Sequence, residues 1–191
     1  MSTGYKIDNQ EGAYFITLQL ISWVDLFSRQ IYRDIVIDNL KFCIANKGLI
    51  VYAYVIMSNH IHLLVQSNSG QLSNTIRDFK SYTSKNFIQY IEQDNESRSE
   101  WLLKVFRQAA LRHKRNSHYQ VWTHENHAMH VYSDKFVTQK LDYIHMNPVR
   151  AGLVRQPEDY IYSSACNYAA RSRSTNTIGS NCEVVFRPEA L

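Results

Sequence analysis

Residues 49–66 read LIVYAYVIMSNHIHLLVQ, and this stretch decides the fold. Its first half, residues 49–57, is a continuous apolar run of strand length. Residues 58–59 (SN) form a two-residue turn, and residues 60–66 return as a second strand. The stretch therefore predicts an antiparallel hairpin.

The segments around this hairpin complete a four-stranded pattern. Residues 13–24 (AYFITLQLISWV) are apolar and rich in residues that favour strands, and residues 128–132 fit a short fourth strand. Apolar residues at near-helical spacing predict a helix over residues 28–46 and a longer one that begins at Leu72. The order β-α-β-β-α-β is the split βαβ, ferredoxin-like arrangement. We therefore predict an α+β fold in which helices cover one face of an antiparallel sheet.

One extra helix follows the last predicted strand. Ser133 and Asp134 cap its N-terminus, and we expect it to end near Asn147, because Pro148 disfavours helical geometry in the residue before it. This helix lies outside the βαβ pattern and carries Tyr143.

The composition is that of a globular domain. The chain has 191 residues, of which 45% are hydrophobic and 13% aromatic, enough to bury a core. It contains no apolar stretch long enough to cross a membrane and no signal peptide, so we expect a cytoplasmic protein. The three cysteines lie too far apart for a disulfide framework or a zinc ribbon. We expect one domain over residues 1–170 and a loosely ordered polar tail over residues 171–191.

Positive charge is concentrated in part of the chain. The net charge is +4, but residues 104–124 contain no acidic side chain and hold several basic ones interleaved with aromatic residues. Such a pattern suits a phosphate backbone whose bases can stack. The basic residues that we predict to contact DNA are Lys80, Lys85, Arg107, Arg112, Lys114, Arg115 and Lys140.

His60 and His62 are the first candidate metal ligands. Residues two apart on a strand face the same side, so the two imidazoles project together. At this spacing they can converge on one divalent ion and leave open positions for substrate oxygens. A pair of partly buried histidines satisfied by hydrogen bonds is the more common explanation of a lone His-x-His, so the motif needs a second element.

The extra helix supplies that second element. Lys140, Tyr143 and Asn147 lie at i, i+3 and i+7 and form one polar stripe. A tyrosine attacks phosphorus effectively only when its oxygen is deprotonated or its target is strongly polarised, because its free pKa is about 10. A metal ion held by two histidines and a neutral amide keeps most of its positive charge for the phosphate. The stripe and the histidine pair together indicate a metal-dependent site with a tyrosine nucleophile.

Three separated segments carry a family resemblance. They are YVIMSNHIHLLV at residues 54–65, LDYIHMNPVRAGLV at residues 141–154 and PEDYIYSSACNY at residues 157–168. In this order they closely resemble the REP-associated tyrosine transposases, a branch of the single-tyrosine HUH transposases of the insertion-sequence 200-like kind. The resemblance extends over residues 14–168.

The resemblance implies a role for each site residue. His60 and His62 match the HUH metal ligands, Asn147 matches the third ligand position, and Tyr143 matches the nucleophile. The implied cofactor is a divalent metal ion, Mg²⁺ or Mn²⁺. The implied reaction is DNA transposition, in which single-stranded DNA next to a hairpin is cut through a 5′-phosphotyrosine intermediate and then rejoined.

Other residues compete for these roles. Tyr82 is the main rival nucleophile, since it also sits on a predicted helix near lysines. The longer match around Tyr143 favours Tyr143. The histidines of residues 124–130 (HENHAMH) offer alternative ligands, but this segment fits a loop that enters a strand better than a metal cluster.

Other function classes remain open at this point. One is a DNA-hairpin-binding module, domesticated from a transposase, that no longer cuts. A replication or mobilisation initiator would use the same chemistry, but the chain is short and lacks a helicase-like region. A zinc hydrolase would need a carboxylate, and none is close in sequence to His60 and His62. A homodimer in which Tyr143 serves the partner's histidine pair is as reasonable physically as a site within one chain.

Overall fold

The computed structural model describes residues 6–93, 96–112 and 118–172. Two of the predicted DNA contacts, Lys114 and Arg115, lie outside these ranges, as does the predicted tail from residue 173 onward. No helix within the described ranges is long and apolar enough to cross a membrane.

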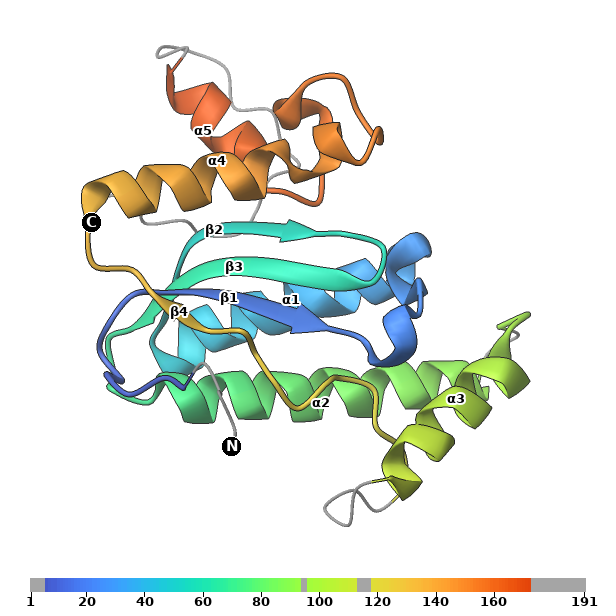
Figure 1. Ribbon diagram of the computed structural model, residues 1–191. Coiled ribbons are helices and arrows are strands. Elements are labelled where there is room, and N and C mark those ends of the chain that lie inside the picture. The colour runs from blue at the N-terminus through green and yellow to red at the C-terminus, as the bar shows by residue number, and fades with distance from the viewer. Residues whose placement is uncertain (1–5, 94–95, 113–117, 173–191) are drawn as a thin grey trace.

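The strands form one antiparallel sheet (Figure 1). They are β1 (Tyr14–Gln19), β2 (Leu49–Ile56), β3 (His60–Ser67) and β4 (Met129–His130). The order across the sheet is β2-β3-β1-β4, and each neighbouring pair is antiparallel. The predicted hairpin joins β2 to β3, and the amide of Met57 donates to the carbonyl of His60 at 2.9 Å to close its turn. The α+β, ferredoxin-like prediction is confirmed.

Helices pack on both faces of this sheet. The α-helices of the described chain are α1 (Gln30–Lys47), α2 (Leu72–Gln93), α3 (Ser99–Leu111), α4 (Asp134–Arg150) and α5 (Ala165–Ser172). Helices α1 and α2 cover one face, and α4 crosses the other (Figure 1). The short 3-10 turns are η1 (Ile21–Trp23), η2 (Leu26–Ser28) and η3 (Pro157–Asp159).

The alternation of side chains along β3 divides the core in two. Ile61, Leu63 and Val65 are fully buried and belong to the larger core under α1 and α2. His62 and Leu64 face the opposite way, as the period of two requires. Leu64 packs in a smaller core with Ile144 of α4. The histidine face of the sheet is therefore the face that α4 covers.

Three details differ from the sequence prediction. The first strand, predicted over residues 13–24, ends at Gln19, because residues 21–23 form the turn η1. Helix α3 was not predicted, although its residues alternate in burial at helical spacing. Helix α4 does not end at Asn147, because it continues through Pro148 to Arg150. Pro148 has no amide to donate to the carbonyl of Ile144, but the helix continues past it, and the amide of Ala151 donates to the carbonyl of Asn147 at 3.0 Å.

The chain after α4 returns to the outer edge of β2. The amide of Ile56 donates to the carbonyl of Tyr162 at 2.9 Å, and the amide of Ser164 donates to the carbonyl of Tyr54 at 3.0 Å. The hydroxyl of Tyr168 donates to the carbonyl of Tyr52 at 2.9 Å. Backbone groups along this edge are thus paired within the chain.

Candidate active site

His60 and His62 lie side by side at the start of β3. In the sheet register they stand opposite Gln19 and Thr17 of β1. Their ring centroids are 4.6 Å apart. The prediction that both imidazoles project from one face is confirmed by this contact.

Each histidine is oriented by a hydrogen bond at Nδ1. Nδ1 of His60 donates to Oδ1 of Asn59 at 2.6 Å, and Nδ1 of His62 is joined to Oγ1 of Thr17 at 2.9 Å. A hydrogen bond at Nδ1 fixes the ring and directs Nε2 outward as the ligating nitrogen. Nε2 of His62 is buried and has no hydrogen-bond partner within the described ranges. A buried polar atom without a partner calls for an explanation, and a role as a metal ligand would supply one for this nitrogen.

Burial also keeps these imidazoles in the form that binds metal. Burial, with smaller electrostatic contributions from His60 and Lys140, lowers the pKa of His62 to about 3. Burial likewise lowers the pKa of His60 below its ordinary value. Both rings are therefore neutral at neutral pH, and a neutral imidazole is the ligand form.

Tyr143 of α4 meets this pair from the other side. Its ring centroid lies 5.1 Å from that of His62 and 5.8 Å from that of Phe15, both edge-on. The side chain remains 39% exposed, so the phenol is open to solvent beside a buried ring. The predicted nucleophile and the predicted ligands thus come together within a single chain.

Two cations flank the tyrosine. Nζ of Lys140 lies 5.7 Å from the centre of the Tyr143 ring and 4.6 Å from that of Phe15. The guanidinium of Arg150 lies 5.7 Å from the centre of the Tyr143 ring. Lys140 was predicted, and Arg150 was missed. Its position seven residues after Tyr143 places it on the same helix face, which is the signal that could have found it.

Asn147 lies one turn after Tyr143 and is partly buried. Its side chain makes no hydrogen bond to another described residue, so its amide oxygen is available. Within the described ranges, no group of three or more His, Cys, Asp or Glu side chains could hold a metal ion. A metal site here would have to combine the two histidines with an amide, and the Nε2 of His62 fits that use.

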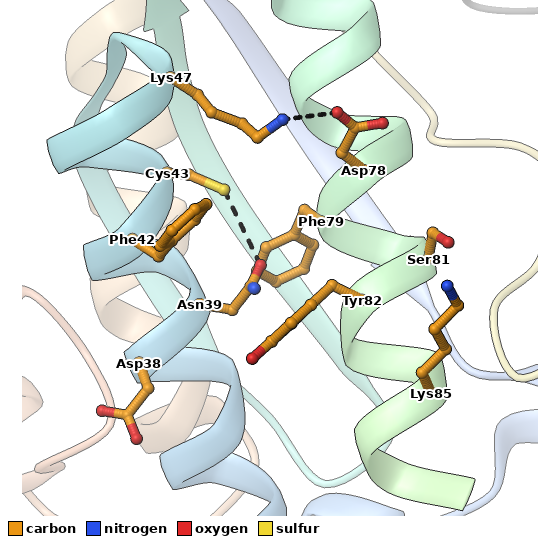
Figure 2. Close-up of a pocket in the computed structure, with 10 residues that line it drawn as sticks. All are labelled: Asp38, Asn39, Phe42, Cys43, Lys47, Asp78, Phe79, Ser81, Tyr82 and Lys85. Atoms are coloured by element: carbon orange, nitrogen blue, oxygen red, sulfur yellow. Dashed lines mark hydrogen bonds and ion pairs between the residues drawn. The ribbon is translucent and has the colours of Figure 1, made fainter.

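Tyr82, the rival nucleophile, lies on the other side of the sheet. Figure 2 shows it in a cavity of about 560 Å³ between α1 and α2, near Phe42, Phe79 and Lys85. The residues that line this cavity come only from those two helices, which cover the face opposite to His60 and His62.

The alternative histidines also lie apart from the pair. The ring of His130 is 5.1 Å from that of Tyr14, and Nε2 of His127 is 3.9 Å from a carboxylate oxygen of Glu125. Neither belongs to a metal-binding cluster of the described chain.

The other predicted DNA contacts lie away from Tyr143. Lys80 donates to the carbonyl of Thr123 and to Oδ1 of Asn126, both at 2.7 Å, and burial lowers its pKa to about 8. It lines a cavity of about 520 Å³ that also includes Lys85 and has no acidic lining residue. Arg107 is exposed on α3 and donates to the hydroxyl of Tyr119 at 3.1 Å. Arg112 is exposed at the end of that helix.

The described chain thus combines a ferredoxin-like sheet, a histidine pair on one face of that sheet and a tyrosine on the helix that covers this face. Comparison with known proteins identifies the family. The family model "Transposase IS200 like" matches residues 24–147, which is more than half of the chain. The protein belongs to the IS200-like transposase family.

A solved structure has a similar fold. It is described as the structure of a REP-associated tyrosine transposase bound to a REP hairpin. The TM-score is 0.60 at 19% sequence identity, and the match covers 98% of this chain and 100% of that one. No curated protein matches the sequence.

Proposed function

We propose that this transposase-family protein is a metal-dependent endonuclease and strand transferase that acts on single-stranded DNA next to hairpins. The observation that carries the proposal is the contact between the Tyr143 and His62 rings, 5.1 Å apart, beside an unpartnered His62 Nε2. The similarly folded REP-associated transposase was solved with a DNA hairpin, which supports the choice of substrate.

Tyr143 is the proposed nucleophile. Its phenolic oxygen loses its proton and attacks a backbone phosphorus, and the bond from phosphorus to the 3′ oxygen breaks. That oxygen takes up one proton and leaves as a 3′-hydroxyl, so the proton count balances. The 5′ phosphate stays on the tyrosine. Attack by a 3′-hydroxyl on this phosphotyrosine reverses the step and joins strands with no external energy source.

His60, His62 and Asn147 are the proposed holders of a divalent ion, Mg²⁺ or Mn²⁺. Bound there, the ion would polarise a phosphoryl oxygen of the scissile phosphate. The protein contributes neutral imidazoles with fixed orientation, because Thr17 and Asn59 hold their Nδ1 atoms. Lys140 and Arg150 lie beside the tyrosine and provide positive charge for the phosphate that it attacks.

The proposal extends to the chain that supplies the tyrosine, to the domain boundaries and to the DNA contacts. Tyr143 serves the histidine pair of its own chain, because their rings are in contact there. The transposase domain comprises residues 1–170, and residues 171–191 are an appended tail, of which residues 171–172 still belong to α5. Contacts with DNA extend from the site to the exposed Lys85, Arg107 and Arg112.

A covalent adduct is the direct test. We expect the protein, incubated with Mn²⁺ and an end-labelled single strand that carries a hairpin, to form a labelled adduct that survives denaturing electrophoresis. Tyr143→Phe should abolish the adduct, and the matched control Tyr82→Phe should form it in full. An adduct of full strength from Tyr143→Phe would overturn the assignment. Metal-independent hairpin binding without any cleavage would favour a non-cleaving hairpin-binding module instead.

A further inference from the structure

Trp23 is a large aromatic side chain left in solvent. It is 62% exposed, and its indole makes no hydrogen bond or ring contact with any other described residue. Trp122, by contrast, is buried and hydrogen-bonded, as tryptophan usually is: it is 4% exposed and its Nε1 donates to Oγ1 of Thr83. Burial of the large indole ring usually stabilises the fold, and the exposed Trp23 does not make this contribution. Its exposure therefore needs another explanation.

The backbone holds Trp23 in an unfavourable conformation. Ser22 has φ 54° and Trp23 has φ 55°, so two consecutive residues with side chains occupy the left-handed region. The flanking backbone fixes this turn: Ile21 donates to the carbonyl of Val121 at 2.8 Å, and Val24 donates to the carbonyl of Ile21 at 3.2 Å. Strain of this kind persists only where the surroundings enforce it, and it clusters at functional sites.

A single side chain ties this turn to the histidine pair. Nδ2 of Asn59 donates to the carbonyl of Trp23 at 3.5 Å, while Oδ1 of Asn59 accepts from Nδ1 of His60 at 2.6 Å. The amide of Leu20, which precedes the turn, donates to the carbonyl of Asn59 at 3.0 Å. Figure 1 shows the end of β1 and the β2–β3 turn at the same end of the sheet. The backbone of Trp23 is therefore linked to His60 through the side chain of Asn59.

We infer that Trp23 is a stacking platform for one unpaired nucleobase of the strand that enters the His60–Tyr143 site. This inference rests on the proposed function, because it needs a single-stranded substrate. Every base presents a flat aromatic face, so a Trp platform accepts any base and works by stacking rather than by reading the sequence. A base held there fixes the position of the adjoining backbone relative to the histidines, which makes Trp23 a positioning residue.

The test measures stacking separately from cleavage. The probe is oligothymidylate with one 2-aminopurine, whose fluorescence falls when it stacks, moved along the strand one position at a time. Measurements use the Tyr143→Phe protein without added metal, so cutting does not contribute. We expect quenching at one position, loss of that quenching in Trp23→Ala, and affinity for the strand lowered by about tenfold. Trp23→Phe should keep most of both.

The control is Phe42→Ala, which removes another exposed aromatic ring. Phe42 is 51% exposed in the cavity between α1 and α2, on the face opposite to the histidines (Figure 2). Its loss should change neither the quenching nor the affinity. Circular dichroism establishes that each variant is folded.

Each result bears on one proposal or on both. The parent for these measurements is the Tyr143→Phe protein. If Trp23→Ala binds the strand and quenches as the parent does, the platform is overturned and the nuclease proposal stands. The same conclusion follows if Trp23→Phe binds the strand as weakly as Trp23→Ala. If Trp23→Ala is weakened but the native protein never forms a Tyr143 adduct, the platform stands and the nuclease proposal fails. If the parent does not bind single strands, both fail.

Discussion

The hydroxyl of Thr17 decides which nitrogen of His62 is free. It is joined to Nδ1 at 2.9 Å, which leaves Nε2 for a ligand. We expect Thr17→Val to weaken Mn²⁺ binding by about 10- to 100-fold, because the ring loses its fixed orientation. Isothermal titration with Mn²⁺ measures this effect. Thr138→Val, which alters an exposed hydroxyl on α4, serves as the control, and equal affinities for both variants would contradict the role of Thr17.

His145 should make stability depend on pH. Its Nε2 is joined to Oγ of Ser164 at 2.9 Å, and burial lowers its pKa to about 4, an effect that Asp142 partly offsets. The unfolded chain gains a proton on this residue as the pH falls below its ordinary pKa of 6.5, whereas the folded chain does not until about pH 4. The free energy of unfolding should therefore decrease as the pH is lowered from 6.5 to about 4. The decrease is up to about 1.4 kcal/mol per pH unit for each such histidine.

Urea denaturation at a series of pH values measures that slope. His145→Gln cannot gain the proton, so its slope should be smaller than that of the parent. His62 contributes in the same direction, because burial lowers its pKa to about 3. Parallel slopes for the parent and His145→Gln would show that His145 does not titrate in this way.

Single residues of the site were predictable to different degrees. The common direction of His60 and His62 follows from the alternation of a strand, which needs no tertiary information. The contact between Tyr143 and His62 does not, because it depends on where α4 crosses the sheet. The hydrogen bond between Thr17 and His62 depends on the register of β1 against β3, which the sequence pattern leaves open.

Helix α4 is held on the sheet by one apolar stripe. Ile144 is fully buried and packs against Phe15, Val55 and Leu64. We expect Ile144→Ala to lower the free energy of unfolding by about 2–5 kcal/mol, since it leaves a cavity in a small core. The exposed Gln139→Ala on the same helix should change it by less than about 0.5 kcal/mol. Chemical denaturation decides, and equal losses for the two variants would mean that this face does not anchor α4.

The elements that sequence analysis missed had weak local signals. In α3, Leu102, Phe106 and Ala109 are buried at i, i+4 and i+7, but the polar run before them reads as a linker and the cations after them read as a loop. The extension of α4 beyond Pro148 has no local signal, because the preference of the residue before a proline predicts a helix boundary there. Packing overrides such a preference when the proline itself is buried, as Pro148 is.

At the scale of the whole molecule, the exposed cations predict how binding responds to salt. If Lys85 contacts one phosphate, Lys85→Gln should reduce the slope of log affinity against log salt by about 0.7 on a single strand. Lys47 lines the cavity between α1 and α2 together with Lys85, but it is paired with Asp78 at 2.6 Å. Lys47→Gln should therefore leave the slope unchanged. Fluorescence anisotropy over a range of salt concentrations measures both. Identical slopes for Lys85→Gln and the parent would exclude Lys85 from the DNA contacts.

The topology of the whole sheet was the most predictable feature. Alternating strand and helix patterns, with a hairpin in the middle, allow few ways to form one antiparallel sheet with a common core. What the pattern could not supply is the position of the chain after α4, because the pairing of Ser163 and Ser164 with β2 joins residues far apart in sequence.

That pairing has a consequence for how copies of the protein behave together. Strand β2 (LIVYAYVI) carries no charge or proline, the usual guards against joining with a neighbour's strand. Residues 162–168 instead bond to the carbonyls of Tyr52 and Tyr54 and to the amides of Tyr54 and Ile56, so an incoming strand would have to displace these bonds. The chain thus covers part of the edge of an uncharged strand with its own residues. We therefore expect resistance to aggregation at high concentration to depend on a segment that takes no part in the proposed chemistry.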